Sequence, residues 1–414
     1  MPRIHSGPLR RALVVEHPDP VLDELLRAQG IEVDRRMEVP EEDTLIDWLR
    51  EGRHELLFKR SRVPVTRAML EACPDLLAVQ LCCIGDDSVD KRACADHGVL
   101  VFNDPISNGR SVVELVVSHL IALSRRLYET NEHTRKGGFD KSSTERYEVQ
   151  GRVLGVLGLG NIGRQVAKVG DALGMKILFH DSREVAREVG REMGWEQAPT
   201  VDALFRASDY LTVHVSASDA DGRSNRGMLT REHFDMLGAD RSGDSPRIFL
   251  NLARGFLYDP RDLLGSIEAG IVRRAAVDVY PDEPRGKEPW NNPYASQPRV
   301  VTTPHMGAAT LDAQPRIARR VAQTVRAFAA QGALRDCVFR PRLSLGLGEV
   351  PPGSTVLAVV HSTRRGSRKA LQDAIFEAGA SNLSSVHQDF EDHGMAYDLC
   401  ATDRPLDARQ LQRI

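Results

Sequence analysis

Three polar residues, each just beyond an apolar segment, have the types needed to oxidise an alcohol. Arg254, Glu283 and His305 each follow a run of the kind that forms a buried strand. A guanidinium can hold a carboxylate through two hydrogen bonds and polarise a neighbouring oxygen. A histidine can take a hydroxyl proton near neutral pH, and a carboxylate beside it raises its pKa and orients its ring. These groups suit hydride transfer from a 2-hydroxy acid to a nicotinamide, where the cofactor carries the hydride.

Each of these residues also has an ordinary structural explanation. Arg254 could form a surface salt bridge, and His305 could be a packed or capping histidine. Glu283 precedes Pro284, which is a common loop pattern. The three together, in one chain with a cofactor loop, favour the catalytic interpretation.

A glycine-rich loop earlier in the chain has the form that binds a dinucleotide. It runs through Gly158, Gly160, Asn161, Ile162 and Gly163, directly after an apolar strand. The first glycine permits a tight turn, the second lets the backbone approach a pyrophosphate, and the third lets the helix pack on the strand. The N-terminus of that helix then faces the negative charge. An ordinary glycine-rich turn is the alternative. The prediction of a dinucleotide-binding loop therefore rests on its position between a strand and a helix.

Asp181 ends the next predicted strand, 181 − 158 = 23 residues after Gly158. A spacing of roughly 20 residues suits a carboxylate that binds the adenosine ribose hydroxyls and would repel a 2′-phosphate. The sequence therefore favours NAD over NADP. Arg183 nearby weakens that preference, and Asp181 could instead cap a helix.

The elements that must position these groups are predicted to be strands that alternate with helices. Short apolar runs recur with helical segments between them, which is typical of parallel βα units. Ligands of such sheets bind at the carboxyl ends of the strands, so we expect all of these polar groups on one side. One long helix is predicted over 112–136, from a capping box at Ser111 to Gly137. Another is predicted near 316–330, with Gly332 as its stop.

Composition excludes several classes of protein. The 414 residues include 55 Lys and Arg and 58 Asp and Glu, a formal charge of −3, so there is no basic excess for nucleic acid. No apolar run approaches the roughly 20 residues that span a bilayer, so no membrane partner is expected. The six cysteines form no CxxC pair and fit neither a disulfide framework nor a zinc site. We expect no metal and a reducing, cytoplasmic location.

The sequence resembles the D-isomer-specific 2-hydroxyacid dehydrogenases. The glycine loop and three later segments match that family's motifs in order and spacing: Asn251–Gly255, Asp278–Pro284 and Thr303–Met306. The resemblance implies an α/β fold with a Rossmann-type doubly wound cofactor domain and a flavodoxin-like substrate domain. It further implies a small α+β, ACT-like domain at the C-terminal end.

The implied domain boundaries make the substrate domain discontinuous. Residues 1–107 and 307–340 would form it, with the NAD-binding Rossmann domain at 108–306 inserted between. Residues 341–354, rich in proline and glycine, are predicted as a linker. Residues 355–414 follow a β-α-β-β order and would be a truncated ACT-like domain, because no last strand of the β-α-β-β-α-β pattern is predicted. Thr363 and Arg365 depart from the related effector loop, which puts serine binding in doubt.

The resemblance also assigns roles residue by residue. Arg254, Glu283 and His305 would be catalytic. Cofactor contacts would include the glycine loop and a set on the other strand ends: Asp181, His214, Val215, Ala253, Asp278, His305 and Gly307. Substrate contacts would be Arg60, Ser61, Arg62, Cys83, Ile84, Gly85, Asn108, Lys141 and Arg254. Two departures lie at the cofactor rim, namely Ser216, where proline is common, and a lengthened polar stretch at 238–246.

The N-terminal segments further resemble the branch of the family that oxidises 3-phosphoglycerate to 3-phosphohydroxypyruvate in serine biosynthesis. The implied partner is a small, phosphorylated 2-hydroxy or 2-oxo acid, and the implied assembly is a homodimer or homotetramer. Another D-2-hydroxyacid dehydrogenase, of glyoxylate/hydroxypyruvate or phosphoerythronate type, is the alternative in the same class. A non-catalytic, dinucleotide-sensing interaction protein is the alternative in a different class.

Overall fold

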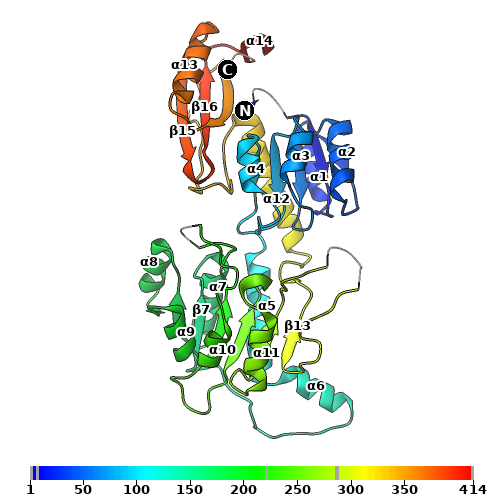
Figure 1. The fold of residues 1–414 in the computed structure, drawn as a ribbon, viewed down its shortest axis with the longest axis vertical. Coiled ribbons are helices and arrows are strands. Elements are labelled where there is room, and N and C mark those ends of the chain that lie inside the picture. Colours follow the sequence, from blue (N-terminus) through cyan, green and yellow to red (C-terminus); the bar gives the residue numbers. More distant parts are fainter. Residues whose placement is uncertain (1–2, 6–8, 220–221, 285–288, 412–414) are drawn as a thin grey trace. The chain divides into compact units, whose positions relative to one another are not determined.

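The structure is a computed structural model that describes residues 3–5, 9–219, 222–284 and 289–411. The chain forms two compact units (Figure 1). The first unit contains residues 1–107 and 311–414, and the second contains residues 108–310. Each unit is built around its own sheets, so each positions its own set of predicted site residues.

The second unit is built on a seven-stranded sheet whose paired strands are all parallel. In sheet order the strands are β13 (Val300–Thr302), β12 (Arg274–Val277), β11 (Ile248–Asn251), β10 (Tyr210–Val213), β7 (Val153–Leu157), β8 (Lys176–His180) and β9 (Glu196–Gln197). The chain order reverses between β7 and β10. In doubly wound sheets ligands bind at such a reversal, outside the carboxyl ends of the strands.

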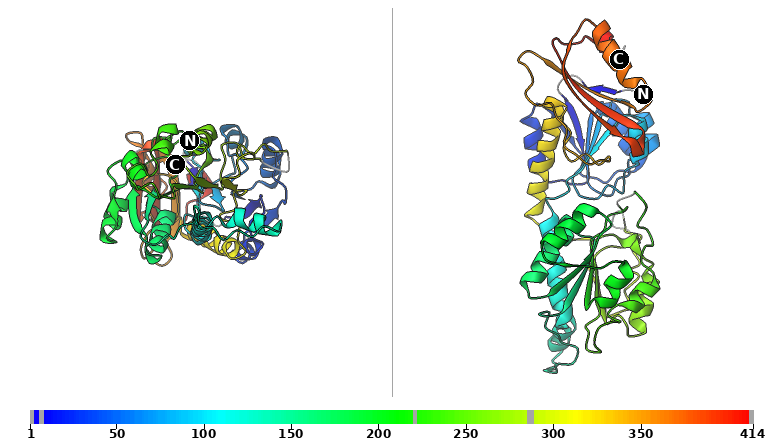
Figure 2. Two further views of the ribbon diagram at one scale, coloured as in Figure 1. Left: turned by 90° about the horizontal axis from the view of Figure 1, so that it is seen from below. Right: turned by 90° about the vertical axis from the view of Figure 1, so that its left-hand side faces the viewer.

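Helices cover both faces of this sheet (Figures 1 and 2). Two separate apolar clusters fill the spaces between helices and strands. The helices of this unit are α5 (Gly109–Ser124), α6 (Leu127–Arg135), α7 (Asn161–Ala172), α8 (Glu184–Glu192), α9 (Val201–Ala207), α10 (Arg231–Met236), the 3₁₀ turn η1 (Gly255–Leu257) and α11 (Pro260–Glu268). Of these, α6 buries no residue and does not cover the sheet. Both faces of the strands are therefore buried, as continuous apolar strands require.

The predicted helix over 112–136 differs from the structure at both ends and in the middle. The observed helix α5 begins at Gly109. Ser111 lies inside this helix, with its hydroxyl 2.9 Å from that of Thr310. It stops at Ser124 because Arg126 takes a left-handed conformation, with φ 54°, before α6 starts. Apolar periodicity carries no sign of such a break, since the residue involved is an arginine.

The first unit contains a five-stranded parallel sheet in the order β3-β2-β4-β5-β6, the flavodoxin-like arrangement. The strands are β2 (Arg11–Val14), β3 (Glu32–Arg35), β4 (Leu56–Lys59), β5 (Ala78–Leu81) and β6 (Leu100–Phe102). Its helices are α1 (Val21–Arg27), α2 (Glu42–Gly52), α3 (Arg67–Ala72), α4 (Lys91–Asp96) and α12 (Ala313–Gln331). The predicted stop of α12 at Gly332 is confirmed, because that glycine is left-handed with φ 61°.

A separate antiparallel sheet of four strands completes the first unit. In sheet order it contains β1 (Arg3–His5), β14 (Thr355–Ser362), β16 (Met395–Thr402) and β15 (Asn382–Phe390). One face packs on the core of the parallel sheet through Val360, Tyr397 and Leu399. The other face is covered by α13 (Ser367–Glu377), and the chain adds η2 (Glu391–His393) and α14 (Ala408–Leu411) (Figure 1).

The fourth strand of this sheet comes from the other end of the sequence. Residues 1–107 are all predicted to lie in the substrate domain, yet β1 pairs with β14, with Ile4 opposite Val359. An N-terminal strand thus forms one edge of this sheet, next to β14. A pairing between segments more than 350 residues apart leaves no trace in local periodicity. Residues 412–414 of the predicted module lie outside the described part.

The two parallel sheets and the small antiparallel sheet confirm the predicted fold class. Whether the antiparallel module is an ACT domain stays a prediction. Among the helices that the structure describes, none is both long enough and apolar enough to span a membrane.

Candidate active site

Arg254 stands in the loop that follows β11. At the end of that strand, the Asn251 side chain accepts the N–H of Ala253 at 3.0 Å and donates to the carbonyl of Arg254 at 2.9 Å. At Gly255 an added Cβ would lie 2.0 Å from the carbonyl carbon of Tyr280. Only glycine therefore lets the loops after β11 and β12 touch, and this contact places Arg254 beside the end of β12.

Glu283 and His305 form a hydrogen-bonded pair. Glu283 Oε2 lies 2.7 Å from His305 Nδ1, and Glu283 Oε1 accepts the N–H of Tyr280 at 3.1 Å. Burial lowers the pKa of His305, but the hydrogen bond and charge of Glu283 outweigh it and hold that pKa above its usual value. Burial raises the pKa of Glu283, and the His305 contact more than reverses this. Glu283 is therefore a carboxylate, and it lies next to the His305 imidazole, which readily holds a proton.

His305 has a strained backbone that the end of β12 holds in place. Its φ is 52°, a left-handed conformation that a residue with a Cβ rarely adopts. The buried carboxylate of Asp278 accepts the N–H groups of Met306 and Gly307, both at 2.9 Å, and the hydroxyl of Thr303 at 2.5 Å. Asp278 therefore clamps the turn on both sides of His305. Strain of this kind persists where the surroundings fix it, often at active sites.

The structure brings the three predicted catalytic residues together. The positive charge of Arg254 lowers the pKa of Glu283 and of His305, so it lies near both. All three follow the carboxyl ends of strands, on the edge of the sheet that also bears the glycine loop. Three predicted cofactor contacts share these loops, namely Ala253, Asp278 and Gly307.

The glycine loop has the shape that its spacing predicts. Gly158 has φ 91°, and a Cβ there would meet the carbonyl oxygen of His214 at 2.8 Å. A Cβ on Gly163 would lie 2.0 Å from the carbonyl oxygen of Gly158, so helix and loop are in direct contact. At Gly160 a Cβ would meet only the guanidinium of Arg183, at 3.5 Å. Backbone atoms crowd the first and third glycines, whereas the second glycine has free space beside it. A pyrophosphate could approach the backbone there.

The remaining predicted cofactor residues border this loop. Asn161 and Ile162 form the first turn of α7, where backbone N–H groups lack partners within the helix and can bind an anion. His214 follows β10, and its ring lies 2.9 Å from the hydroxyl of Thr212. Burial lowers the pKa of His214 to about 3, so its ring is neutral. Val215 packs beside Gly158.

The carboxylate of Asp181 is already occupied. Leu159 N–H donates to Oδ2 at 2.7 Å, and Arg183 donates from its backbone at 2.8 Å and from its guanidinium at 3.1 and 2.8 Å. Burial raises the pKa of Asp181, but these hydrogen bonds more than offset it. The side chain of Arg183 is 52% exposed. Ribose hydroxyls would therefore compete with a cation for Asp181, which the spacing argument does not foresee.

In the first unit, the predicted residues Arg60, Ser61 and Arg62 follow β4. The loop is fixed from below, because Glu16 accepts the N–H of Arg62 at 3.0 Å. The buried Lys59 ammonium donates to the carbonyl of Arg60 at 2.9 Å. Ser61 and Arg62 are exposed.

Cys83, Ile84 and Gly85 form the turn after β5 in the same unit. Asn103 donates to the carbonyl of Ile84 at 2.6 Å, and the N–H of Asp104 donates to that of Cys83 at 3.1 Å. The Cys83 thiol contacts the carbonyl of Gly85 at 3.3 Å. These contacts fix the turn whose N–H groups the resemblance assigns to a substrate carboxylate.

Asn108 begins the second unit and is 6% exposed. Its Oδ1 is buried and finds no hydrogen-bond donor among the described residues. This oxygen can therefore act as a hydrogen-bond acceptor. The role of Asn108 in substrate binding stays a prediction.

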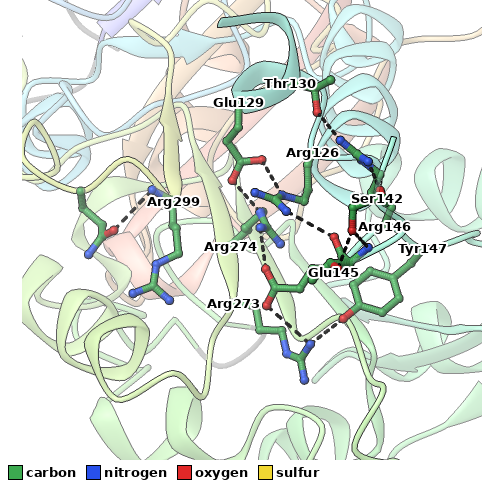
Figure 3. A network of polar contacts seen from close by, with 12 residues as sticks. Arg126, Glu129, Thr130, Ser142, Glu145, Arg146, Tyr147, Arg273, Arg274 and Arg299 are labelled. Atoms are coloured by element: carbon green, nitrogen blue, oxygen red, sulfur yellow. Dashed lines mark hydrogen bonds and ion pairs between the residues drawn. The ribbon is translucent and has the colours of Figure 1, made fainter. Parts of the chain in front are cut away.

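Lys141 lies away from the strand ends that bear Arg254, Glu283 and His305. It lies on the exposed arm after α6, with its ammonium 5.4 Å from the centre of the Phe139 ring. The arm is tied to the start of β12, where buried Arg274 pairs with Glu129 at 2.9 Å and with Glu145 at 2.8 Å (Figure 3). That is the amino end of the strand, at the opposite edge of the sheet from His305.

Sequence reasoning missed the residues that hold the site together. Asn251 anchors the Arg254 loop, Thr303 helps Asp278 to fix the histidine turn, and Tyr280 donates to Glu283. A polar residue directly at the end of an apolar strand, as Asn251 is, was the available signal.

Comparison with known proteins identifies relatives along most of the chain. The family model for the D-isomer specific 2-hydroxyacid dehydrogenase, NAD binding domain, matches residues 117–307. The D-3-phosphoglycerate dehydrogenase of Dictyostelium discoideum is 30% identical over 363 residues, which are 87% of this chain and 84% of that protein. That of Haemophilus influenzae is 32% identical over 320 residues, 77% of this chain and 74% of that protein.

The solved structure of a protein with a different activity shares the fold. A glyoxylate reductase from Paecilomyes thermophila matches with a TM-score of 0.68 at 21% sequence identity. The match covers 80% of this chain and 98% of that one.

Proposed function

Because this chain belongs to the D-isomer specific 2-hydroxyacid dehydrogenase family and is an NAD-dependent enzyme, we propose that it oxidises 3-phosphoglycerate to 3-phosphohydroxypyruvate. One observation carries the proposed chemistry: the 2.7 Å contact between His305 and Glu283, with Arg254 beside it, on the edge that bears the glycine loop. The substrate is proposed from the two relatives, which are both D-3-phosphoglycerate dehydrogenases.

His305 serves as the general base in this proposal. Its Nδ1 faces Glu283, so with the proton on Nδ1 the free lone pair lies on Nε2, which can accept the C2 hydroxyl proton. Glu283 then stabilises the imidazolium that forms. When NAD is bound, its nicotinamide supplies the acceptor for the hydride that leaves C2.

Arg254 holds the substrate carboxylate and polarises the C2 oxygen. The guanidinium offers two parallel donors, and a carboxylate accepts both. Its position beside Glu283 and His305 keeps the bound acid next to the base. Asn251 and Gly255 fix the backbone from which it extends.

Cofactor binding is proposed for the glycine loop and the strand ends around it. Gly160 leaves room for the backbone to approach a pyrophosphate, and Asn161 and Ile162 present the first N–H groups of α7. Asp181 can bind the ribose hydroxyls only when the Arg183 guanidinium releases one of the two carboxylate oxygens to which it donates.

For the substrate side we propose the loops after β4 and β5. Arg60 and Arg62 supply positive charge for a phosphate dianion, with Ser61 as a hydroxyl donor. Backbone N–H groups of the turn at 83–85 bind the carboxylate, and the buried Oδ1 of Asn108 can accept a hydrogen bond from a substrate hydroxyl.

A panel of 2-oxo acids tests the proposed substrate, with NADH consumption followed by absorbance. We expect the highest kcat/KM for 3-phosphohydroxypyruvate, and a loss of roughly tenfold or more in the double variant Arg60→Ala/Arg62→Ala for that acid alone. Equal activity with glyoxylate or hydroxypyruvate would favour the alternative that the glyoxylate reductase likeness suggests. Tight NADH binding without turnover of any acid would favour a dinucleotide sensor.

We also propose a homodimer or homotetramer in a reducing, cytoplasmic compartment. Large apolar side chains are exposed on α6 and the arm after it, with Leu127 at 56% and Phe139 at 82%. Apolar surface of this kind favours association. All six cysteines are free thiols, which fits a reducing environment. Light scattering tests the assembly, and a mass of 45.9 kDa would contradict it.

A further inference from the structure

We infer that the C-terminal sheet binds a divalent transition-metal ion through His361, His387 and Asp398. The three side chains offer ligand atoms that lie within 4.8 Å of one another. His361 Nε2 is 2.5 Å and His387 Nδ1 is 2.9 Å from the same oxygen of Asp398, Oδ2. Two ring nitrogens and one carboxylate oxygen therefore converge on one point, in a unit separate from the proposed dehydrogenase residues Arg254, Glu283 and His305.

Strand pairing creates this convergence. His387 on β15 lies directly opposite Asp398 on β16, and Asp398 lies opposite Val359, two residues before His361 on β14. Alternate residues of a strand share a face, so His361 and Asp398 share the face of Val359 and Cys400 that α13 covers. The ligands are 26 and 11 residues apart in the chain. No short motif joins them, which is why the sequence alone predicts no metal.

The second nitrogen of each ring is held by an acceptor. His361 Nδ1 lies 2.8 Å from the carbonyl oxygen of Ser362, and His387 Nε2 lies 3.2 Å from Asp389 Oδ1. An N–H on these outer nitrogens satisfies both acceptors. The inner nitrogens then carry lone pairs. Metal-binding histidines show this arrangement, in which an outer carbonyl or carboxylate fixes the tautomer and orients the ring.

Without a cation the centre of the cluster is unfavourable. Asp398 is fully buried, and a carboxylate oxygen accepts hydrogen bonds but donates none. Its Oδ1 has no hydrogen bond among the described residues, and the guanidinium of Arg368, at 3.6 Å, is the cation beside it. Two lone pairs that face a carboxylate require a positive charge between them. A metal ion or shared protons can supply it.

The ligand types indicate which ions fit. Imidazole suits Zn²⁺, Co²⁺ and Ni²⁺, whereas Mg²⁺ and Ca²⁺ prefer oxygen ligands alone. Three protein ligands leave a fourth position of a tetrahedral site for water or a small anion. The side chain of His387 is 20% exposed, so solvent reaches the cluster from one side.

Metal content of the full-length protein tests the inference. The chelator-treated protein is dialysed against Zn²⁺ and analysed by atomic emission, and Co²⁺ is titrated while its visible absorption is recorded. We expect one ion per chain and an intense tetrahedral Co²⁺ spectrum. His361→Ala and His387→Ala should lose both, and His133→Ala, which removes an exposed histidine of α6, should keep both.

A folding control keeps the result interpretable. His387→Gln retains a polar side chain of similar size, and thermal melting of the metal-free proteins shows whether each variant folds. Zn²⁺ should raise the melting temperature of the wild type and of His133→Ala only. Metal at well below one ion per chain, or equal content in a folded His387→Gln, would overturn the inference and leave protons as the shared charge. Dehydrogenase activity plays no part in either readout.

Discussion

At the scale of single residues, the pairing of His305 with Glu283 determines when the proposed base is available. Both side chains come from loops after neighbouring strands, and their 2.7 Å contact holds the pKa of His305 above its usual value. A base that must be neutral to accept a proton is then active only above that raised pKa. The pH dependence of oxidation therefore reports directly on this contact.

Glu283→Gln should shift the pH profile of oxidation. The substitution removes the charge that raises the pKa of His305, while burial and Arg254 still lower it. The rising limb of kcat/KM should move to lower pH, and kcat should fall by roughly 100-fold because the ring loses its partner. Initial rates between pH 5 and 10 measure both changes. An unmoved limb would mean that Glu283 does not act on the base.

Arg183→Ala should strengthen the preference for NAD over NADP. The arginine occupies both oxygens of Asp181 and would attract a 2′-phosphate, so its removal frees the carboxylate for the ribose. We expect kcat/KM for NAD divided by that for NADP to rise by about tenfold. Arg187→Ala, on the exposed face of α8, is the matched control. An unchanged ratio would remove Arg183 from cofactor selection.

The sequence predicts the candidate catalytic residues better than it predicts the residues that hold their loops in place. Arg254, Glu283 and His305 follow apolar strands, and parallel topology brings such ends to one edge. The clamp that Asp278 forms on the histidine turn and the occupation of Asp181 by Arg183 depend on loop conformation, which types and spacing do not specify. Lys141 lies on the arm that follows α6, and its role in phosphate binding stays a prediction.

At the scale of elements, close contacts between loops and helices position the site. The α7 helix approaches the glycine loop so closely that Gly163 has no room for a Cβ. Strand ends were predictable from apolar runs and glycine patterns. The break between α5 and α6 was not, because Arg126 adopts a conformation that glycine usually provides.

Gly163→Ala should weaken cofactor binding. Its Cβ would lie 2.0 Å from the carbonyl oxygen of Gly158, so the helix must move away from the loop. Overpacking costs about 1–3 kcal/mol, which corresponds to a loss of roughly tenfold or more in NADH affinity. Gly243→Ala is the control, since a Cβ there meets nothing within 4 Å. Fluorescence titration with NADH measures both, and equal affinities would contradict the described packing.

At the scale of the whole molecule, the chain joins its two ends in one sheet. Strand β1 covers the edge of β14, which would otherwise present unpaired backbone groups. The predicted division into N- and C-terminal domains follows sequence order, and the pairing of β1 with β14 links residues of these two predicted domains. The C-terminal sheet thus includes a strand from the N-terminal part of the sequence.

Deletion of residues 1–5 should loosen the C-terminal sheet without affecting the second unit. The amides of residues 358–360 lose their pairing strand and should exchange with solvent at least about tenfold faster. Hydrogen exchange followed by mass spectrometry measures this. NADH affinity, which depends on residues 108–310, is the internal control. Unchanged exchange in β14 would show that β1 contributes no stability there.

The most direct test is to compare NADH binding with turnover in His305→Ala. If the three strand ends perform the oxidation, the variant should bind NADH nearly as tightly as the wild type. Its kcat should fall by roughly a thousandfold, as loss of a general base commonly causes. Turnover at the wild-type rate in a variant that folds and binds NADH would contradict the role assigned to His305 and with it the proposed active site.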